Sequence, residues 1–474
     1  MDFFIDSSLL THLFPRFSYD DVSKNVRRNV QKRTGCVSCI LLNLDRRFVL
    51  CNLTIQPSMK TATHNDEFRP VVTGLGVVAA NGLGVEEFWR TVVGGLSGVG
   101  PLTLFDASKL PNRIAAEVKG FDPAFHLAGH AKWKRLARHT QFAMAALDMA
   151  LADAGLSASS VFRRPVCVAI GVSTSAIEVV ELAAHGVRQG TENRLSPWLV
   201  WASQPHAVAT TLAEHLGTQV SIRTVATACK AGADALLLAA DAIRTGQVDM
   251  AIAGGTDAPI TASTCAAFSA GRLLSARNDD PARASRPFDR DRDGGVLGEG
   301  AGVVVLESLA HARARGARIW LELCGGASHA DAFGAPAADG LGACMTVALA
   351  NTRLCGEAID YICAHGPSDP VIDRVETEMI RHTFGRHAYR IPVSSIKGVT
   401  GNPLAAAGPM ELIACALAMR DERIPPTANY TTPDPACDLD YVPQARRMRM
   451  EHALINVHGM GGGNTTLVVK KPPA

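Results

Sequence analysis

The chain has 474 residues, of which 47% are hydrophobic, 19% are charged and 42 are glycine. This composition is typical of a large α/β protein with many tight turns, and it excludes a disordered chain or a coiled coil. The formal net charge of +2 gives no electrostatic reason to expect nucleic acid or an anionic membrane as a partner. No apolar run reaches the length of a membrane span.

Residues 1–68 differ from the rest of the chain because they show no clear hydrophobic period and no signal-peptide pattern. We expect this extension to be poorly structured. It is either a docking segment or an artefact of start-site choice with Met59 as the true start, and the second interpretation is favoured. The 12 cysteines form neither a disulfide framework nor a pair of zinc-spaced motifs, which favours reduced thiols and a cytoplasmic location.

Strands and helices alternate from residue 69 onward. Apolar runs of strand length often end in glycine, and segments with apolar residues at helical spacing separate them. The predicted strands cover 69–76, 165–171, 220–227, 249–255, 302–306, 319–323, 361–363, 391–394, 453–457 and 465–469. The predicted helices cover 137–156, 230–245 and 410–419. This alternation predicts a mixed, largely buried sheet with helices on both faces.

A cysteine stands where one of these strands gives way to a helix, in the segment Thr227-Ala-Cys-Lys-Ala-Gly232. The dipole and free N–H groups of a helix N-terminus stabilise a thiolate. A thiolate at Cys229 can take an acyl group from a thioester in a nearly isoenergetic exchange. On this segment alone, however, an inert buried core cysteine is the favoured alternative.

Several longer motifs change that interpretation. They are SRPFDRDRDGG at 285–295, LGEGAG at 297–302, GGTDAP at 254–259, PPTANY at 425–430 and a Pro-Asp-Pro that leads to CDLDYVP at 437–443. With them, residues 69–471 resemble the elongating β-ketoacyl-acyl-carrier-protein synthases of fatty-acid and type II polyketide synthesis. The resemblance implies a thiolase-like, five-layered α-β-α-β-α fold with two similar halves, 69–318 and 319–474.

The resemblance also implies the catalytic set. Cys229 matches the nucleophile, and His365, in Ala-His-Gly, matches the histidine that assists decarboxylation. Lys397 matches the lysine of the family, and Asp373 and Glu376 match acidic residues that support this lysine and the geometry of the site.

The glycine-rich turn at 459–464 matches the segment that supplies an oxyanion-hole N–H, to be paired with the N–H of Cys229. It contains Met460 at the position of the gate and Gly461 beside it. Donors of this kind are needed because both the enolate and the tetrahedral intermediate carry negative charge on oxygen.

Four positions depart from the family pattern. Asn402 replaces a second histidine. An amide can donate a hydrogen bond but cannot be charged. We therefore expect the pH response of the site to come from His365 and Cys229, without a second histidine step. Pro367-Ser-Asp369 replaces the Thr-x-Thr that holds phosphopantetheine. The other two departures are Met460 with His458 in place of the gating phenylalanine and an upstream aromatic residue, and Lys230 in place of a small neutral residue.

The resemblance implies a decarboxylative Claisen condensation of an acyl-Cys229 intermediate with a malonyl-carrier-protein thioester. It requires no metal or diffusible cofactor, because the phosphopantetheine arm arrives on the substrate. The expected partners are an acyl carrier protein and a second subunit, in a homodimer or a heterodimer with a related synthase. Two alternatives stay open: a non-catalytic subunit similar to a chain-length factor, and acyl transfer to a non-carbon acceptor.

Overall fold

The computed structural model describes residues 66–130, 132–161, 165–217, 220–332, 334 and 338–472. The prediction for residues 1–68 lies outside this part of the chain, apart from a short 3-10 turn, η1, at Asp66–Phe68. Regular structure begins with strand β1 at Pro70–Ala79, as the apolar run after residue 69 predicts.

One hydrogen-bonded path of strands runs through the described residues, in the order β11-β10-β14-β15-β9-β1-β8-β7-β5-β6. Its strands in the first half are β1, β5 (Val166–Gly171), β6 (Val220–Val225), β7 (Met250–Asp257) and β8 (Gly300–Ser308). Those in the second half are β9 (Leu321–Ala330), β10 (Tyr361–Cys363), β11 (Val393–Ser394), β14 (His452–Gly459) and β15 (Gly463–Lys470). The short strands are β2 (Gly82–Leu83), β3 (Gly100–Pro101), β4 (Ile114–Ala115), β12 (Arg423–Ile424) and β13 (Arg446–Arg447).

The two halves repeat one topology. In each half the third strand in chain order pairs in parallel with the second, and the second pairs in parallel with the fourth. The fifth strand is then antiparallel to both the fourth and the first. The halves join where β1 pairs with β9.

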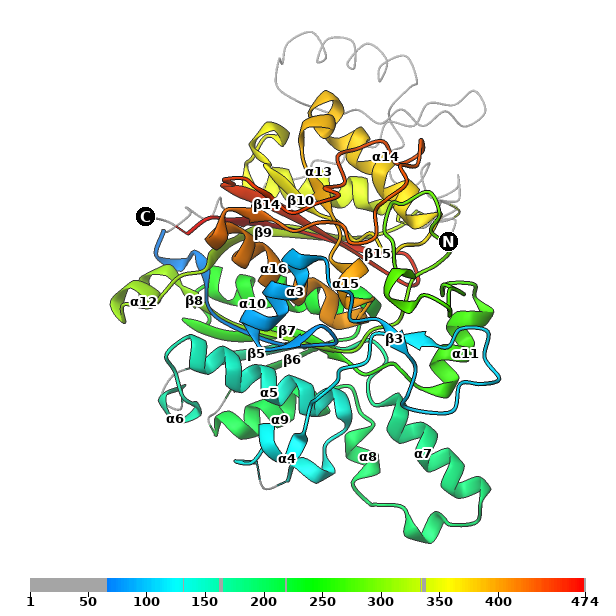
Figure 1. Cartoon of the computed structure of the whole chain (residues 1–474). Helices are drawn as coiled ribbons and strands as arrows, with labels where there is room; N and C mark the ends of the chain where they lie inside the picture. Colours follow the sequence, from blue (N-terminus) through cyan, green and yellow to red (C-terminus); the bar gives the residue numbers. More distant parts are fainter. Residues whose placement is uncertain are drawn as a thin grey trace, which may run out of the picture. The chain divides into compact units, whose positions relative to one another are not determined.

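Helices separate and cover the two halves of this sheet, so that the fold has five layers (Figure 1). The central layer contains α3 (Val85–Gly94), α10 (Ala231–Arg244) and α16 (Ala407–Asp421), and the outer layers contain α5 (Arg138–Asp153) with α9 (Ala207–Leu216), and α13 (Gly340–Thr352) with α14 (Ile372–Phe384). The remaining helices are α4 (Pro123–His126), α6 (Ala158–Val161), α7 (Ile177–Arg188), α8 (Leu199–Ala202), α11 (Ala262–Ala270), α12 (Leu309–Ala314) and α15 (Lys397–Thr400). The predicted α-β-α-β-α architecture is confirmed.

The central position of α16 follows from its sequence. Every residue from Ala407 to Met419 is buried, including Glu411. A helix without a polar face has to lie between other layers, whereas α14 has a strongly one-sided distribution of apolar residues and covers the outside of a sheet.

The central layer is very closely packed at the start of α10. A Cβ added to Gly232 or to Gly255 of β7 would overlap the carbonyl oxygen of Ala405, which immediately precedes α16. A Cβ at Gly408 would lie 2.8 Å from the side chain of Ala233. The backbones of the two halves therefore meet here without intervening side chains, and we call this contact the glycine seam.

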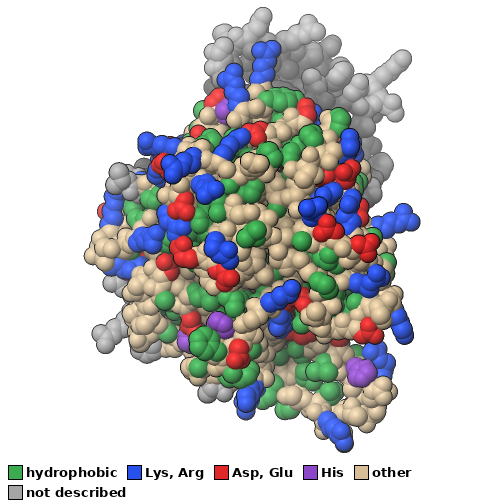
Figure 2. Space-filling model, in the orientation of Figure 1, with side chains coloured by type: hydrophobic (Ala, Val, Ile, Leu, Met, Phe, Trp, Pro, Cys, Tyr) green, Lys and Arg blue, Asp and Glu red, His purple; other side chains and the backbone are tan. Residues whose placement is uncertain are grey.

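The surface agrees with the near-neutral net charge, because Figure 2 shows basic and acidic side chains interspersed over one face. Among the helices described, none combines the length and the hydropathy needed to cross a membrane. All nine cysteines in the described ranges are free thiols.

Candidate active site

Four of the predicted residues line one pocket of about 70 Å³: Cys229, His365, Asn402 and Met460. His458 lines it as well, together with apolar side chains such as Phe268 and Leu297. Segments from both halves of the fold thus converge on the sulfur of Cys229. Gly461 lies in the same turn as Met460 but is not part of the wall, and Lys397, Asp373 and Glu376 lie behind it.

Cys229 sits in a tight turn between β6 and α10. The turn is the 3-10 segment η4, Ala228–Lys230, and Ala228 adopts a positive φ of 60°. A non-glycine residue in this conformation is uncommon and often marks a functional turn. It places Cys229, which is 5% exposed, at the start of the buried helix α10.

The expected lowering of the Cys229 pKa is not found. Burial raises the pKa of this thiol to about 11, although the backbone N–H of Met460 and the ammonium group of Lys397 lower it. Asp257 adds a smaller upward contribution. The position at a helix N-terminus therefore does not outweigh desolvation, and the resting nucleophile is a thiol that must lose its proton during the reaction.

This correction changes what thiol reagents are expected to do. Because the pKa of Cys229 lies above the working range, its alkylation by iodoacetamide should rise roughly tenfold per pH unit between about pH 6 and 9, without a plateau. Among the nine cysteines that the structure describes, the exposed Cys355 should be labelled first. Mass spectrometry of peptides from protein treated at several pH values measures both rates, and a plateau for Cys229 below pH 8 would contradict the raised pKa.

The predicted oxyanion hole pairs the backbone N–H groups of Met460 and of Cys229. Both N–H groups lower the pKa of the Cys229 thiol. Met460 lies in the turn that joins β14 to β15, where Gly461 and Gly462 have φ values of +85° and +86° that favour glycine. The side chain of Met460 is 50% exposed and stands at the entrance of the pocket.

His365 is a neutral imidazole. Burial lowers its pKa well below the usual value, and the charges of Lys397 and His458 lower it further. Its Nδ1 is buried and has no hydrogen-bond partner among the described residues. A buried N–H without an acceptor is costly, so we assign the proton to Nε2, and His365 can then donate a hydrogen bond to a substrate oxygen.

Lys397 holds His365 in place from behind. Its Nζ donates a 2.7 Å hydrogen bond to the carbonyl oxygen of His365 and forms an ion pair with Glu411. The side chains of both ion-pair partners are only 1% exposed. Glu411 was not among the predicted residues, although an isolated acidic residue in the apolar segment 410–419 is a usable signal for a buried partner.

Asp373 and Glu376 hold the geometry of the site through backbone hydrogen bonds. The ion-pair partner of Lys397 is instead Glu411. Glu376 accepts hydrogen bonds from the backbone N–H groups of His365 and Gly366, at 2.9 and 2.8 Å, and reaches Lys397 only through its charge. Asp373 accepts from the N–H of Phe288 at 2.8 Å and lies 3.4 Å from Arg292. Both carboxylates thus shape the backbone around the site.

Asn402 is fixed by its backbone, which leaves its side chain free to face the pocket. Its N–H donates to the carbonyl oxygen of Val296 at 2.8 Å, and its carbonyl oxygen accepts from Gly298 at 2.9 Å. The side-chain Oδ1 accepts from the N–H of Leu404 at 3.4 Å. The amide NH₂ is therefore the end that remains for a substrate oxygen.

His458 brings a second imidazole into the site, contrary to the expectation of a single histidine. The rings of His365 and His458 are 5.8 Å apart and nearly perpendicular. Nδ1 of His458 lies 2.9 Å from Oδ1 of Asn464, whose NH₂ donates to Asp331 at 2.6 Å. Asn464 must therefore accept from His458, so Nδ1 of His458 carries a proton and Nε2 is the ring nitrogen left free of this bond.

The remaining departures are Pro367-Ser-Asp369 and Lys230, and both Pro367 and Asp369 line the pocket around Cys229. The Asp369 carboxylate accepts from the N–H groups of Val371 and Ile372 at the start of α14, at 2.8 and 2.9 Å. Lys230 turns away from the pocket, pairs with Asp234 and donates to Ser328 at 2.8 Å. Lys230 therefore ties α10 to β9 and makes no direct contact with the nucleophile that would activate it.

Family models place this site in a known group of proteins. The N-terminal domain of β-ketoacyl synthase matches residues 69–312, and its C-terminal domain matches residues 322–431. The chain is 40% identical over 408 residues to 3-oxoacyl-[acyl-carrier-protein] synthase 2 of Synechocystis, covering 85% of this chain and 98% of the relative.

Two further comparisons agree. The chain is 39% identical over 421 residues to the tetracenomycin polyketide synthase ketoacyl synthase alpha subunit of Streptomyces glaucescens, covering 86% of this chain and 99% of the relative. A solved type II polyketide ketosynthase, bound to a hexaketide and in complex with its acyl-carrier protein, superposes with a TM-score of 0.78 at 34% identity, covering 85% of this chain and 99% of that one. The chain belongs to the β-ketoacyl synthase family, as its motifs predict.

Proposed function

We propose that this β-ketoacyl synthase loads an acyl group onto Cys229 and condenses it, with loss of CO₂, with a malonyl group on an acyl carrier protein. The observation that carries the proposal is the convergence on one pocket of Cys229, the N–H of Met460, His365 and Asn402. The names of the relatives support an acyl-carrier-protein substrate in fatty-acid or type II polyketide synthesis.

The reaction balances in two steps. In the first, the sulfur of Cys229 forms a bond to the acyl carbon, the carrier thioester bond breaks, and the thiol proton passes to the departing carrier thiolate. In the second, the malonyl carboxylate leaves as CO₂, and its electron pair forms the new carbon–carbon bond to the acyl group. Cys229 departs as a thiolate and recovers a proton from solvent.

Each step needs different groups. The N–H groups of Cys229 and Met460 hold the acyl oxygen while it carries negative charge. Nε2–H of His365 and the amide NH₂ of Asn402 donate to the malonyl thioester oxygen, which becomes the enolate oxygen. The raised pKa of the Cys229 thiol requires a base during loading, and we propose that Nε2 of His458, which lines the same pocket, accepts this proton.

This division of labour predicts a selective effect of His458→Phe. The loss of a general base should slow acylation of Cys229 by about a hundredfold, while pre-acylated enzyme should condense at nearly the parental rate. Intact-mass measurements of acyl-enzyme after rapid mixing give the first rate, and product formation from pre-loaded enzyme gives the second. His452→Phe is the matched control, because His452 is at the other end of the same strand. If Cys229 is acylated at the parental rate in His458→Phe, His458 is not the base for this step.

Partners and setting form a further part of the proposal. We propose an acyl carrier protein and a second synthase subunit as partners. Strand β6 offers an edge for the second subunit, because it ends the order of described strands and most of its side chains are at least partly exposed. A cytoplasmic location would keep the thiol of Cys229 reduced. The presence of Cys229 and the likeness to an alpha subunit do not favour a non-catalytic chain-length factor.

The decisive experiment is incubation with acyl and malonyl carrier proteins, followed by intact-mass analysis of enzyme and carrier. The proposal requires an acyl adduct that is absent in Cys229→Ala and a carrier product extended by two carbons. An adduct without extension would select acyl transfer to another acceptor. The absence of any adduct would leave the subunit role as the better explanation.

A further inference from the structure

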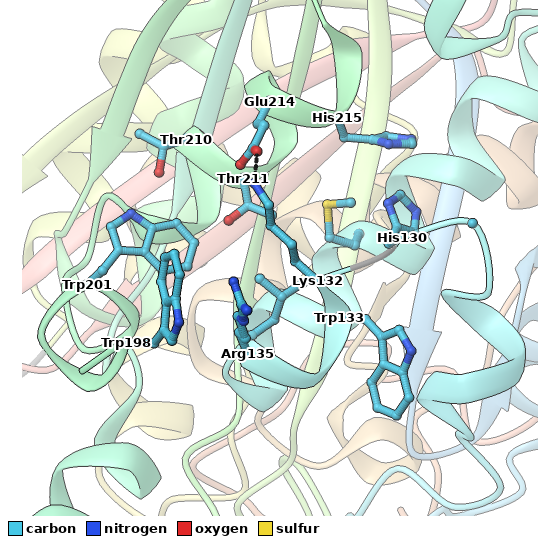
Figure 3. Close-up of a pocket in the computed structure, with 13 residues that line it drawn as sticks. His130, Lys132, Trp133, Arg135, Trp198, Trp201, Thr210, Thr211, Glu214 and His215 are labelled. Carbon is cyan, nitrogen blue, oxygen red and sulfur yellow. Dashed lines mark hydrogen bonds and ion pairs between the residues drawn. The ribbon is translucent and has the colours of Figure 1, made fainter. Parts of the chain in front are cut away.

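A second cavity, of about 440 Å³, lies outside the active site on the first half of the fold. Figure 3 shows it between α8, α9 and the 3-10 turn η2, Trp133–Arg135. Trp198 and Trp201 stand on one side of it, and His130 and His215 lie close together on the other. The cavity shares no lining residue with the pocket around Cys229.

The two histidines share a carboxylate. Nε2 of His130 lies 3.0 Å from one oxygen of Asp148, and Nε2 of His215 lies 2.9 Å from the other. The three residues come from the loop after α4, from the middle of α5 and from the last turn of α9. Their ligand atoms all lie within 4.8 Å of one another, and no other group of three such residues occurs among the residues that the structure describes.

This donor set is suited to a transition metal. Zinc and its neighbours bind imidazole nitrogen and carboxylate oxygen, often with three protein ligands and one open position. In a tetrahedral site with bonds of about 2.0–2.1 Å, ligand atoms are about 3.4 Å apart. Here the two imidazole nitrogens lie 3.0 and 2.9 Å from the carboxylate oxygens, so a metal ion would require them to move apart by a few tenths of an ångström. We propose that His130, Asp148 and His215 form a binding site for a divalent transition-metal ion, with its fourth position open to the cavity.

The surroundings are compatible with a dication. Each oxygen of the Asp148 carboxylate already faces one imidazole nitrogen, so the three ligand atoms are held together without a rearrangement of the backbone. The side chains of His130 and His215 are 11% and 22% exposed, whereas that of Asp148 is 40% exposed and stays accessible to an ion from solvent. Lys132 is paired with Glu214, and Arg135 stacks on Trp198 with its guanidinium 4.6 Å from the ring.

Metal binding requires each imidazole to present a lone pair at Nε2. In the hydrogen-bonded trio these nitrogens donate to Asp148, so each neutral ring must move its proton to Nδ1, and a protonated ring must release one. The metal would add a link between elements that already meet here through hydrogen bonds and through the rings of His130 and His215, whose centroids are 4.1 Å apart. The proposed condensation does not use this site.

The test uses tag-free, full-length protein that has been treated with a chelator. Titration with Zn²⁺ by calorimetry should show one strong site and a raised melting temperature, and Co²⁺ should give the absorption of a nitrogen- and oxygen-ligated ion. Asp148→Asn and His215→Gln should weaken Zn²⁺ binding at least about a hundredfold, with condensation activity in metal-free buffer unchanged. His185→Gln is the matched control, because His185 is an exposed histidine on α7; this variant should bind Zn²⁺ like the parent.

Tryptophan fluorescence supplies a local readout. Ni²⁺ should quench emission because Trp133, Trp198 and Trp201 line the same cavity, and both site variants should lose this quenching. Equal Zn²⁺ affinity in parent and variants, or the absence of a strong site in the folded parent, would overturn the proposal. A sulfur-to-cobalt charge-transfer band that disappears in Cys229→Ala would also overturn it, because the metal would then be bound at the active site.

Discussion

Replacement of Lys397 by methionine is expected to destabilise the protein by about 3–5 kcal/mol, because it leaves the carboxylate of Glu411 buried without its partner. Both side chains are 1% exposed, so water cannot replace the ammonium group. The same change removes the donor to the carbonyl oxygen of His365. Chemical denaturation monitored by circular dichroism measures the loss of unfolding free energy.

The pH dependence of this variant has a defined sign. Burial already raises the pKa of Glu411 from 4.5 to about 7, even though Lys397 lowers it. A carboxyl with a raised folded-state pKa contributes stability below its unfolded pKa and loses it as the pH rises through the folded value. Without Lys397 the folded pKa moves higher, so the variant should lose more stability than the parent between about pH 5 and 8.

A double variant separates stability from catalysis. Lys397→Met with Glu411→Leu removes both charges and should recover most of the lost unfolding free energy. Its condensation rate should stay low, because His365 still lacks the hydrogen bond to its carbonyl oxygen. If the single and double variants are equally unstable, the ion pair is not the source of the destabilisation. Parental activity in the double variant would show that Lys397 does not position His365.

Replacement of Asn402 by alanine is expected to slow decarboxylation and condensation by about two to three powers of ten, the usual cost of losing one oxyanion donor. Acylation of Cys229 should be nearly unchanged, since that step uses the N–H groups of Cys229 and Met460. The backbone hydrogen bonds of Asn402 to Val296 and Gly298 remain, so the fold should be retained. Release of CO₂ from malonyl carrier protein, measured beside acyl-enzyme formation, gives both rates.

Two further substitutions sharpen this test. Asn402→Asp should be slower than Asn402→Ala, because a carboxylate repels the developing enolate. Asn402→His should keep measurable activity, and it restores the residue that the family resemblance implies at this position. Condensation at the parental rate in Asn402→Ala would show that the amide is not a donor and would strengthen the alternative of acyl transfer without condensation.

Much of the fold could be predicted from local pattern. The segment 165–171 is a continuous apolar run that ends in glycine, and β5 occupies Val166–Gly171. The predicted helix 410–419 lies within α16 because its residues are apolar on all sides. Strand ends were less predictable: β8 extends from Gly300 to Ser308, beyond the predicted 302–306, because pairing with β1 and β7 continues past the apolar run.

The chemistry of the site was only partly accessible from the sequence. The motifs predict the convergence of Cys229, His365 and Asn402, but not the partner of Lys397, because an ion pair between α15 and α16 depends on packing. The role of His458 depends on the contact of its Nδ1 with Asn464, which fixes the tautomer. The pKa of Cys229 could not be predicted either, since desolvation in the folded state opposes the helix dipole.

The glycine seam has a mechanical consequence. A single methyl group at Gly232 or Gly255 would already collide with the backbone of Ala405. This close contact leaves no room for a rigid-body rotation of one half against the other. Admission of an acyl chain to a space of about 70 Å³ must come from rotamer changes in individual side chains. Met460 is unbranched and half exposed, so its side chain is the most adaptable of these. The backbone around the site therefore stays fixed while the Met460 side chain changes rotamer to admit the acyl chain.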